Sequence, residues 1–447
     1  MRERLITSFF DTEYLEYARY VVSSRAIPHL VDGLKPSQRK IIHVANKIWK
    51  PGQSKQMKLF QLAGRVAADA YYHHGSSSLE SAMVNMTQTF KNSLPLLRGH
   101  GQFGTLREPD AGAPRYIGAS LHPNFHLIYK DFDLLEPKTE EGYEIEPEFF
   151  LPIIPTVILN GTSGIAVGFA TKILNRKPLD VINACIDVLN GKELKPLIPW
   201  IKGFDGEFKR NILNPNSWTL HGKYKVVNTT TVHISEIPPN ITCESYEEHL
   251  ITLLDKKIIS DYEDNCSGSI DYTIKFKRVV LNELISNNKL EKTLRLTSKD
   301  TENLTVLDET GTLKIFLSAE DIVHHFVNVR LTYYDKRKFL LIDNLERSII
   351  RLTNMARFIK DIIDGKLKVN NVAKTTIISY LEKHKYDKIE DSFGYLLNMP
   401  IYSLTKERFE DLLKKKGEAE TDLSHTKTLQ AKDMYLEDLT KLKKELT

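Results

Sequence analysis

The sequence contains little cysteine. Its 447 residues include three, Cys185, Cys243 and Cys266, and no C-x-x-C pair. This scarcity excludes a disulfide scaffold, disfavours a cysteine-based zinc site and fits a reducing compartment. The sequence also lacks a G-x-x-x-x-G-K-[ST] phosphate loop and a G-x-S-x-G motif. ATP binding by this chain and serine-hydrolase chemistry are therefore unsupported.

A signal peptide is not recognisable either, because the charged first residues precede only a short mixed stretch. The uncharged run 149–171 has the length of a membrane span, but Pro152, Pro155 and the pair Asn160-Gly161 interrupt it. We expect buried strands joined by a tight Asn-Gly turn in this run. The sequence therefore predicts no membrane partner.

Net charge is also small, at +4, and as a total it indicates no nucleic-acid partner. The distribution of that charge is uneven. Residues 1–130 hold 17 Lys and Arg against 9 Asp and Glu, a net of +8, which leaves −4 on the remaining residues. A basic N-terminal third joined to a mildly acidic body indicates a surface for an acidic partner such as DNA.

The basic third is predicted to consist of short helices. Asp11 can cap a helix that runs to about residue 24, Pro36 suits the first turn of a helix over 36–48, and a further helix covers about 58–72. Another helix begins at Ser77, where Ser-Ser-Leu-Glu forms a capping box. Short helices with a basic surface indicate a helix-turn-helix or winged-helix DNA-binding domain over residues 1–130.

Residues 131–317 are predicted to form a mixed α/β domain with many strands. Segments 224–234, 269–279 and 304–316 alternate in polarity or are rich in β-branched residues. Asp308-Glu-Thr-Gly311 marks a hairpin within the last of these segments.

The periodicity changes after residue 317. Ser318 can cap a helix whose apolar positions keep a helical spacing until Gly365 ends it, and 429–447 repeats the pattern with leucines. The segments 318–365 and 429–447 therefore indicate an antiparallel coiled-coil arm, with 366–428 as a small helical tip. Two ordinary core helices are the alternative. The predicted fold class is α+β and multidomain.

The motif with chemical potential runs from Gly99 to Thr105, Gly-His-Gly-Gln-Phe-Gly-Thr, and is followed by Ala111-Gly-Ala-Pro-Arg-Tyr116. Its three glycines let the backbone approach a phosphate-bearing strand closely. A phenol, with a pKa near about 10, is a poor nucleophile and needs cations to stabilise the phenolate and the charge on a phosphorane-like transition state. Arg115 could supply that stabilisation to Tyr116; a packed core tyrosine is the alternative.

The histidine and carboxylate pairs do not predict a metal site. His73 and His74 are adjacent, so they do not share a helix face, and no H-E-x-x-H or Cys/His set accompanies them. Asp131-Phe-Asp133 resembles a metal pair, but we expect it to be an exposed turn. We therefore predict no metal ligands in this chain.

Several motifs, in this order and at these approximate spacings, resemble the DNA breakage-reunion region of type II topoisomerases. They are Arg25-Ala-Ile-Pro28, Asp32-Gly-Leu-Lys-Pro36 with Arg39, Tyr72-His-His-Gly75, Gly101-Gln-Phe-Gly104, Arg115-Tyr116, Asn160-Gly-Thr-Ser-Gly-Ile165 and Glu236-Ile-Pro-Pro239. The resemblance covers nearly the whole chain and combines features of eukaryotic topoisomerase II and of the gyrase A subunit. The chain length is closest to that of the separate cleavage subunits of T-even phage topoisomerases.

The resemblance implies catalytic roles for four residues. Tyr116 would attack a DNA phosphodiester, form a 5′-phosphotyrosyl bond and free a 3′-hydroxyl, with Arg115 beside it. Arg25 would reach the scissile phosphate. His74 would position that phosphate or assist proton transfer, whereas His73 is expected to be structural.

The resemblance also implies DNA-binding roles. Lys35 and Arg39 would bind flanking phosphates, and the helix from Ser77 would be the recognition helix. Ile165 would wedge between base pairs and bend the duplex. A solvated surface lysine and a plain core isoleucine are the alternatives for Lys35 and Ile165. Residues 131–317 would form the tower domain and 366–428 the C-gate dimerisation region.

As an enzyme, such a chain would be a type II topoisomerase, an ATP-hydrolysing isomerase that acts as a homodimer on double-stranded DNA, because each tyrosine cuts one strand. The family's Mg²⁺ site needs a Glu and an Asp-x-Asp set on a separate domain that is not recognisable here. We therefore expect a partner subunit to bind Mg²⁺ and ATP. Without a recognisable DNA-wrapping domain, relaxation and decatenation are expected instead of negative supercoiling. The expected location is the cytoplasm of a bacterium or a phage-infected host.

Two other functions are compatible with the residues alone. The first is a non-enzymatic, dimeric winged-helix DNA-binding protein. The second is a metal-dependent nuclease that cleaves by water attack and releases free ends.

Overall fold

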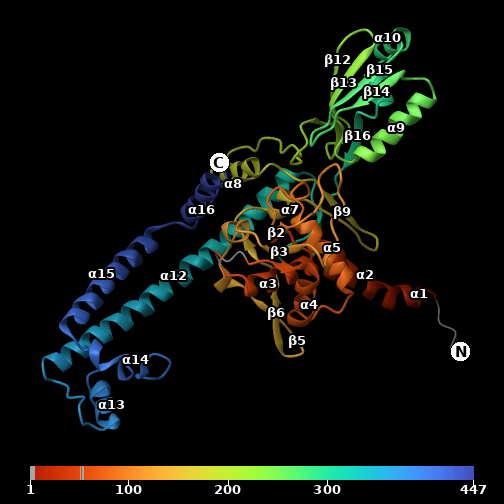
Figure 1. The fold of residues 1–447 in the computed structure, drawn as a ribbon. Coiled ribbons are helices and arrows are strands. Elements are labelled where there is room, and N and C mark those ends of the chain that lie inside the picture. Colours follow the sequence, from red (N-terminus) through yellow and green to blue (C-terminus); the bar gives the residue numbers. More distant parts are fainter. Residues whose placement is uncertain (1–5, 51, 53–54) are drawn as a thin grey trace. The chain divides into compact units, whose positions relative to one another are not determined.

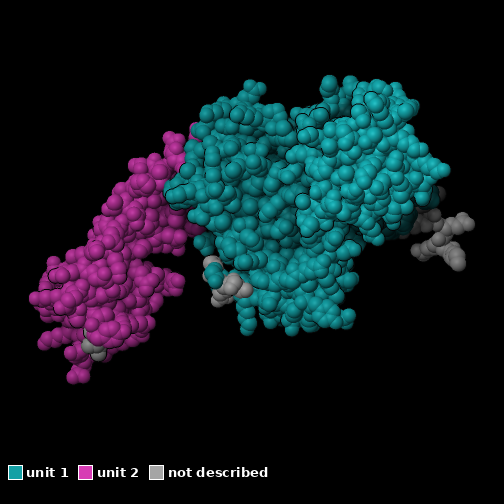
Figure 2. Space-filling model, turned by 45° about the horizontal axis from the view of Figure 1, so that its top comes forward, with its two compact units in different colours: residues 1–330, 436–447 teal, residues 331–435 magenta. Residues whose placement is uncertain are grey.

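The chain folds into two compact units. The computed structural model describes residues 6–50, 52 and 55–447. Unit 1 comprises 1–330 with 436–447, and unit 2 comprises 331–435 (Figure 2). Within the described residues, every helix is too short or too polar to serve as a membrane span.

A helix with two π-helical turns begins unit 1. It consists of α1 (Ile6–Phe9), a π turn (Phe10–Tyr14), α2 (Leu15–Val21) and a second π turn (Val22–Ala26). Each π turn accommodates one residue more than an α-helical turn. Asp11 lies inside this helix, so the prediction that Asp11 caps its N-terminus is wrong.

Three helices and a small sheet follow (Figure 1). The helices are α3 (Pro36–Ile48), α4 (Leu59–Asp69) and α5 (Ser76–Thr87). The antiparallel sheet has the order β1 (Met57–Lys58), β3 (Gly118–Leu121), β2 (Leu97–His100). Helix α3 begins at Pro36 as predicted. Helix α5 begins one residue before Ser77, and its N-cap Gly75 has no side chain, so the predicted capping box is wrong.

Short paired segments connect this region to the next. They are α6 (Asn124–Ile128), β4 (Tyr129–Lys130), a 3₁₀ turn (Phe132–Leu134), β5 (Pro137–Glu140), β6 (Tyr143–Pro147), β7 (Leu151–Pro152), α7 (Thr156–Leu159), β8 (Thr162–Ile165) and β9 (Ala170–Ile173). Strands β4–β7, β5–β6 and β8–β9 pair antiparallel. The run predicted as buried strands contains one buried helical turn, α7, and Gly161 adopts the positive φ of 63° that the expected Asn-Gly turn requires.

Residues 178–301 form a mixed region with two antiparallel sheets, and we call residues 203–301 the tower region. Helix α8 (Pro178–Leu189) precedes a sheet of order β10 (Glu207–Arg210), β11 (Ser217–His221), β16 (Thr297–Thr301). The second sheet has the order β12 (Lys223–Val226), β13 (Thr231–Glu236), β15 (Tyr272–Lys275), β14 (Asp261–Asp264). Helices α9 (Cys243–Asp255), α10 (Arg278–Ser286) and α11 (Leu290–Thr293) complete it.

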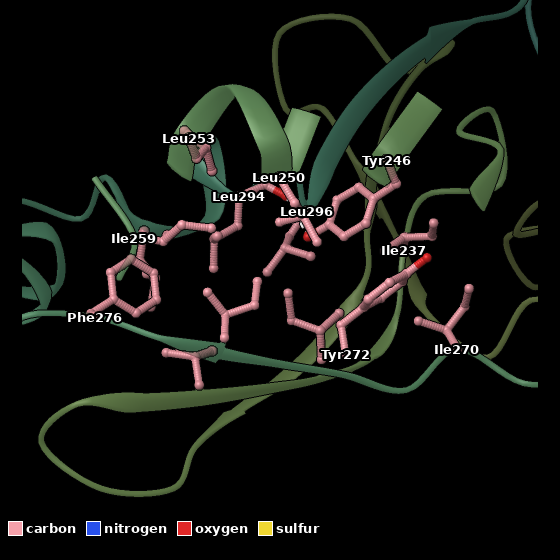
Figure 3. Close-up of a cluster of buried hydrophobic side chains, with 14 of the residues drawn as sticks. Ile237, Tyr246, Leu250, Leu253, Ile259, Ile270, Tyr272, Phe276, Leu294 and Leu296 are labelled. Carbon is pink, nitrogen blue, oxygen red and sulfur yellow. Dashed lines mark hydrogen bonds between the residues drawn. The ribbon is translucent and has the colours of Figure 1, made fainter. Parts of the chain in front are cut away.

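An apolar core lies between α9 and the second sheet. Tyr246 and Leu250 of α9 pack with Tyr272 and Ile274 of β15, and all four are fully buried. Figure 3 shows these helix and strand side chains pointing toward one another. The alternation of buried and exposed residues along β13 and β15 places one face of the sheet on this core.

Strands β17 (Thr305–Leu307) and β18 (Leu313–Ile315) form the hairpin predicted at residues 308–311. Helix α12 (Ala319–Ile363) follows, and the Ser318 hydroxyl accepts a hydrogen bond from the Asp321 amide at 3.1 Å, as predicted for its cap. At 1.5 Å per residue, this helix is roughly 65–70 Å long.

Unit 2 contains most of α12 and a returning helix beside it (Figure 1). Its further elements are α13 (Lys374–Lys383), α14 (Gly394–Leu397), a 3₁₀ turn (Ile401–Ser403), α15 (Lys406–Thr428) and the start of α16 (Ala431–Glu445). Glu346 pairs with Lys427, and Tyr334 stacks on Tyr435 at 4.5 Å between ring centroids. The lower number thus meets the higher one, so the two helices run antiparallel.

The return helix begins earlier than the sequence pattern suggested. Helix α15 starts at Lys406, not at 429, and a break at Leu429-Gln430 separates it from α16. The predicted tip 366–428 therefore includes most of the return helix. The remaining helices pack Leu381, Phe393 and Leu396 against Phe358 of α12 in a small core.

Candidate functional site

Tyr116 lies exposed on a tight turn directly before β3. We call residues 101–117 the tyrosine loop. The Tyr116 side chain is 68 % exposed, which excludes the packed core alternative. Its amide donates to the Ala113 carbonyl at 2.9 Å, and its carbonyl accepts from Lys58 Nζ at 2.6 Å. The Arg115 guanidinium lies 5.0 Å from the centroid of the Tyr116 ring, so a cation and a phenol stand together in solvent.

The tyrosine loop is fastened at its base by a buried amide. Gln88 Nε2 donates to the Phe103 carbonyl at 2.8 Å and to the Pro109 carbonyl at 2.9 Å. Gly104 has a φ of +77°, and a Cβ there would meet the Pro109 backbone at 2.6 Å. Contacts within the protein therefore account for this glycine without a phosphate nearby.

The adjacent histidines have different partners. His73 Nε2 lies 2.8 Å from Glu140 Oε1 of β5, which makes His73 part of a surface ion pair. His74 Nε2 lies 3.1 Å from the Tyr20 hydroxyl of α2, and its ring meets Tyr72 edge-on. The structural assignment of His73 therefore fits its contact, and His74 faces the N-terminal helix.

Arg25 belongs to the same group as His74. It is exposed on the second π turn, and its positive charge acts on the Tyr72 phenol. Burial raises the pKa of Tyr72, while Ser78 and Arg25 oppose that rise. The structure thus brings Arg25 and His74 together around Tyr72, and Arg115 together with Tyr116. Among the described residues, no hydrogen bond or ring contact joins the two groups.

Ile165 projects from the hairpin of β8 and β9 and is 86 % exposed, which excludes the core alternative. The hairpin is held at its base, since Lys35 Nζ donates to the Ser163 carbonyl at 2.6 Å. A Cβ on Gly164 would meet the Ala26 carbonyl oxygen at 2.2 Å, so the strand fits only without a side chain there. Burial lowers the pKa of Lys35.

Arg39 is not on the surface. It is 2 % exposed, and its Nε donates to Asp32 Oδ2 at 2.6 Å while Nη2 donates to Asp32 Oδ1 at 3.1 Å and to the Leu34 carbonyl at 3.2 Å. The predicted phosphate contact of Arg39 is therefore wrong. A bidentate pair with Asp32, seven residues earlier, uses this guanidinium instead.

Ser77 lies exposed in the first turn of α5. Asp131 is not the exposed residue expected, because its carboxylate pairs with the buried Arg330. Across residues 6–50, 52 and 55–447, no group of at least three His, Cys, Asp or Glu side chains is arranged to hold a metal ion. The described residues therefore do not fit the family's magnesium site.

Several residues around the site carry no sequence signal. Tyr20, Lys58 and Gln88 contact His74, Tyr116 and the loop base across 15 to 58 positions, and a hydrogen-bond partner that far away leaves no periodic pattern. The same holds for Arg107 of the tyrosine loop, whose partners lie about 130 positions further along the chain.

Comparison with known proteins agrees with this fold and site. The family model for the A-type chain of DNA gyrase/topoisomerase IV matches residues 25–444. The chain therefore belongs to the family of type II DNA topoisomerases, in the part that corresponds to the gyrase A subunit.

Particular relatives support the same assignment. The chain is 33 % identical over 463 residues to the mitochondrial DNA topoisomerase 2 of Dictyostelium discoideum, covering 100 % of this chain and 35 % of the relative. It is 33 % identical over 489 residues to DNA topoisomerase 2-alpha of Gallus gallus, covering 98 % and 31 %. The chain thus spans about a third of the length of these relatives.

A solved structure matches over nearly the whole chain. The DNA-binding, cleavage and re-ligation domain of Plasmodium falciparum topoisomerase II superposes with a TM-score of 0.87 at 32 % identity, covering 98 % of this chain and 64 % of that one. The match confirms a mixed α+β fold of this kind.

Proposed function

We propose that the chain is the DNA cleavage and rejoining subunit of a type II topoisomerase. The observation that carries the proposal is the exposed Tyr116 with the Arg115 guanidinium at its ring, in a chain of this family. An exposed tyrosine on a fastened loop can reach a polymer backbone that no pocket could enclose.

In the proposed reaction the Tyr116 oxygen attacks a DNA phosphorus. A phosphorus–oxygen bond forms to Tyr116, the bond to the 3′-oxygen breaks, the phenol proton passes to a base, and the 3′-oxygen takes up a proton. Arg115 and Arg25 would stabilise charge on the phosphate oxygens, and His74 would position the phosphate or move the proton. Because one phosphoester replaces another, the reverse attack by the 3′-hydroxyl reseals the strand.

DNA would bind across the basic face of the first 130 residues, arranged as a winged helix. Helix α5, with Ser77 in its first turn, would be the recognition helix, and Lys35 would contribute a phosphate contact. Ile165 would enter a base step and bend the duplex, which its exposure at a held hairpin supports. Residues 131–317 would support the bent DNA as a tower.

We further propose a homodimer with unit 2 as a coiled-coil arm whose tip forms a second dimer contact. A double-strand break needs two tyrosines, hence two copies. Because no carboxylate cluster lies among the described residues, Mg²⁺ and ATP would be bound by a partner subunit. The resulting activity would be relaxation and decatenation, in the cytoplasm of a bacterium or a phage-infected host.

The decisive experiment is denaturant trapping of cleaved DNA by the chain reconstituted with the ATPase and magnesium-binding subunit from the same source. We expect a covalent protein–DNA adduct with wild type and none with Tyr116→Phe, at unchanged DNA affinity. A non-enzymatic DNA-binding protein would yield no adduct with either chain, and a nuclease would release free ends. Adducts that persist in Tyr116→Phe would disprove the nucleophile.

A further inference from the structure

Arg107 occupies the far end of the tyrosine loop and points away from Tyr116's turn into the tower region. It follows a tight turn in which the Thr105 amide donates to the Glu108 carbonyl at 2.7 Å. The Arg107 side chain is only 15 % exposed. It reaches residues about 130 positions further along the chain.

The receptor of this arginine is the end of β13 and the segment after it. Arg107 Nη1 donates to the Pro238 carbonyl at 2.8 Å and to the Ile241 carbonyl at 3.0 Å. Its Nη2 donates to the Ile237 carbonyl at 2.6 Å and pairs with the Glu236 carboxylate. The guanidinium is therefore saturated by one carboxylate and three carbonyls, a set that lysine cannot satisfy because it lacks the planar fork.

Glu236 is itself fixed before Arg107 arrives. The Asp205 amide donates to Glu236 Oε2 at 3.0 Å, and the Ile237 amide donates to Oε1 at 3.1 Å. Glu236 is 6 % exposed, and Ile237 belongs to the buried core between α9 and the sheet. The Glu236-Ile-Pro-Pro239 motif thus forms a rigid receptor attached to the tower core.

The tyrosine loop needs such an attachment. Between β2 and β3 it contains no regular element, and its base is held by Gln88 at Phe103 and Pro109. Those bonds leave the tip with Arg107 as its connection to residues outside the loop's own base. Misplacement of a reacting group by about 1 Å can cost about 100-fold in rate.

We infer that Arg107 is a positioning residue that locks the tyrosine loop to the Glu236–Ile241 segment of the tower region, so that the tower sets the placement of Tyr116 on the scissile phosphate. This inference rests on the proposed function of Tyr116. It gives the Glu-Ile-Pro-Pro motif a task in the cleavage step, not in DNA contact.

The test compares Arg107→Ala, Arg107→Lys and Glu236→Gln in the full chain reconstituted with the ATPase and magnesium-binding subunit. The matched control is Arg347→Ala, which removes an exposed arginine paired with Asp343 four residues away. We expect Arg107→Ala to slow adduct formation by about 10- to 100-fold, while the DNA dissociation constant stays within about twofold. Arg107→Lys and Glu236→Gln should lie between Ala and wild type, and Arg347→Ala should equal wild type.

Hydrogen–deuterium exchange of the chain alone provides a second measurement. Amides of residues 102–117 should exchange faster in Arg107→Ala and unchanged in Arg347→Ala. Wild-type adduct rates in folded Arg107→Ala, unchanged exchange of 102–117, or a loss of adduct matched by an equal loss of DNA affinity would each overturn the positioning role. If wild type itself forms no adduct, the proposed function fails instead, so the two failures are distinguishable.

Discussion

Tyr116 and Tyr246 belong to the same compact unit, yet they represent two opposite uses of one residue type. Tyr116 stands on a turn with 68 % of its surface in solvent and an arginine against its ring. Tyr246 is completely buried between α9 and the sheet, and its hydroxyl donates to the Leu294 carbonyl at 3.0 Å. One phenol is free to react, whereas burial raises the pKa of the other beyond its ordinary range.

The same contrast holds for isoleucine and for arginine. Ile165 is exposed on a hairpin while Ile234 is buried in the tower core. Arg115 lies in solvent while Arg39 is saturated by Asp32. Exposed members of each pair gather near the proposed DNA surface, so residue type by itself does not distinguish a reacting group from a structural one.

The largest expected effect separates the two tyrosines. Tyr116→Phe should abolish the covalent adduct, a loss of at least about 1000-fold, because the attacking oxygen is removed; its melting temperature should match wild type. Tyr246→Phe should keep adduct formation and lose about 1–3 kcal/mol of stability, since the Leu294 carbonyl is left buried without its donor. Denaturant trapping and thermal unfolding measure both; the comparison breaks if Tyr246→Phe loses the adduct while folded.

The next effect tests whether Arg39 is structural. Asp32→Ala removes the acceptor of Arg39 and of the Leu34 and Phe150 amides, leaving a buried cation unpaired. Loss of one partner of a buried ion pair costs about 3–5 kcal/mol. Urea unfolding should show this loss. A variant as stable as wild type would contradict the structural assignment of Arg39.

The two isoleucines give a smaller pair of effects. Ile165→Ala should leave stability within about 0.5 kcal/mol but reduce the bend angle of bound DNA and slow cleavage several-fold. Ile234→Ala should cost about 2–5 kcal/mol of stability, because it opens a cavity in the core. Fluorescence energy transfer across a labelled duplex reads the bend. Equal bending by both variants would remove Ile165 from the DNA interface.

The smallest effect is a pH dependence at His29. Burial lowers its pKa from 6.5 to about 4, and its Nδ1 accepts from the Val31 amide, which requires the neutral ring. Because the folded pKa lies below the unfolded one, stability is complete above pH 6.5 and falls as pH drops toward 4. His29→Gln should flatten this part of the stability profile in urea titrations. An unchanged slope would assign the acid sensitivity to other groups.

Local signals in the sequence predicted local structure well. Proline at the first turn of α3, the Asp-Glu-Thr-Gly hairpin and the Ser318 cap are each determined by a few neighbouring residues, and all three are observed. Asp11 misled because an acidic residue inside a π turn has the same local signature as a cap. The start of α15 was missed because its residues 406–428 are strongly polar and show no apolar stripe.

The site was predictable in its reacting group and not in its supports. Motif resemblance identified Tyr116 and Arg115, which the structure places side by side. It also suggested Arg39 as a surface cation, because a sequence does not show which carboxylate a buried guanidinium will meet. The contacts of Lys58, Gln88 and Arg107 depend on tertiary proximity across many residues, so no spacing rule could reveal them.

The second π turn, at Val22–Ala26, has a consequence for the aim of Arg25. A π turn holds one surplus residue, and each residue advances a helix by about 100°. Removing one of Ser23 or Ser24 would convert the turn to α geometry. The packed segment from Ile27 onward would stay in place, but every residue before the deletion would rotate about the axis by a quarter turn or more. The helix therefore works like an adjustable collar, in which one serine sets the azimuth of the aromatic residues relative to Arg25.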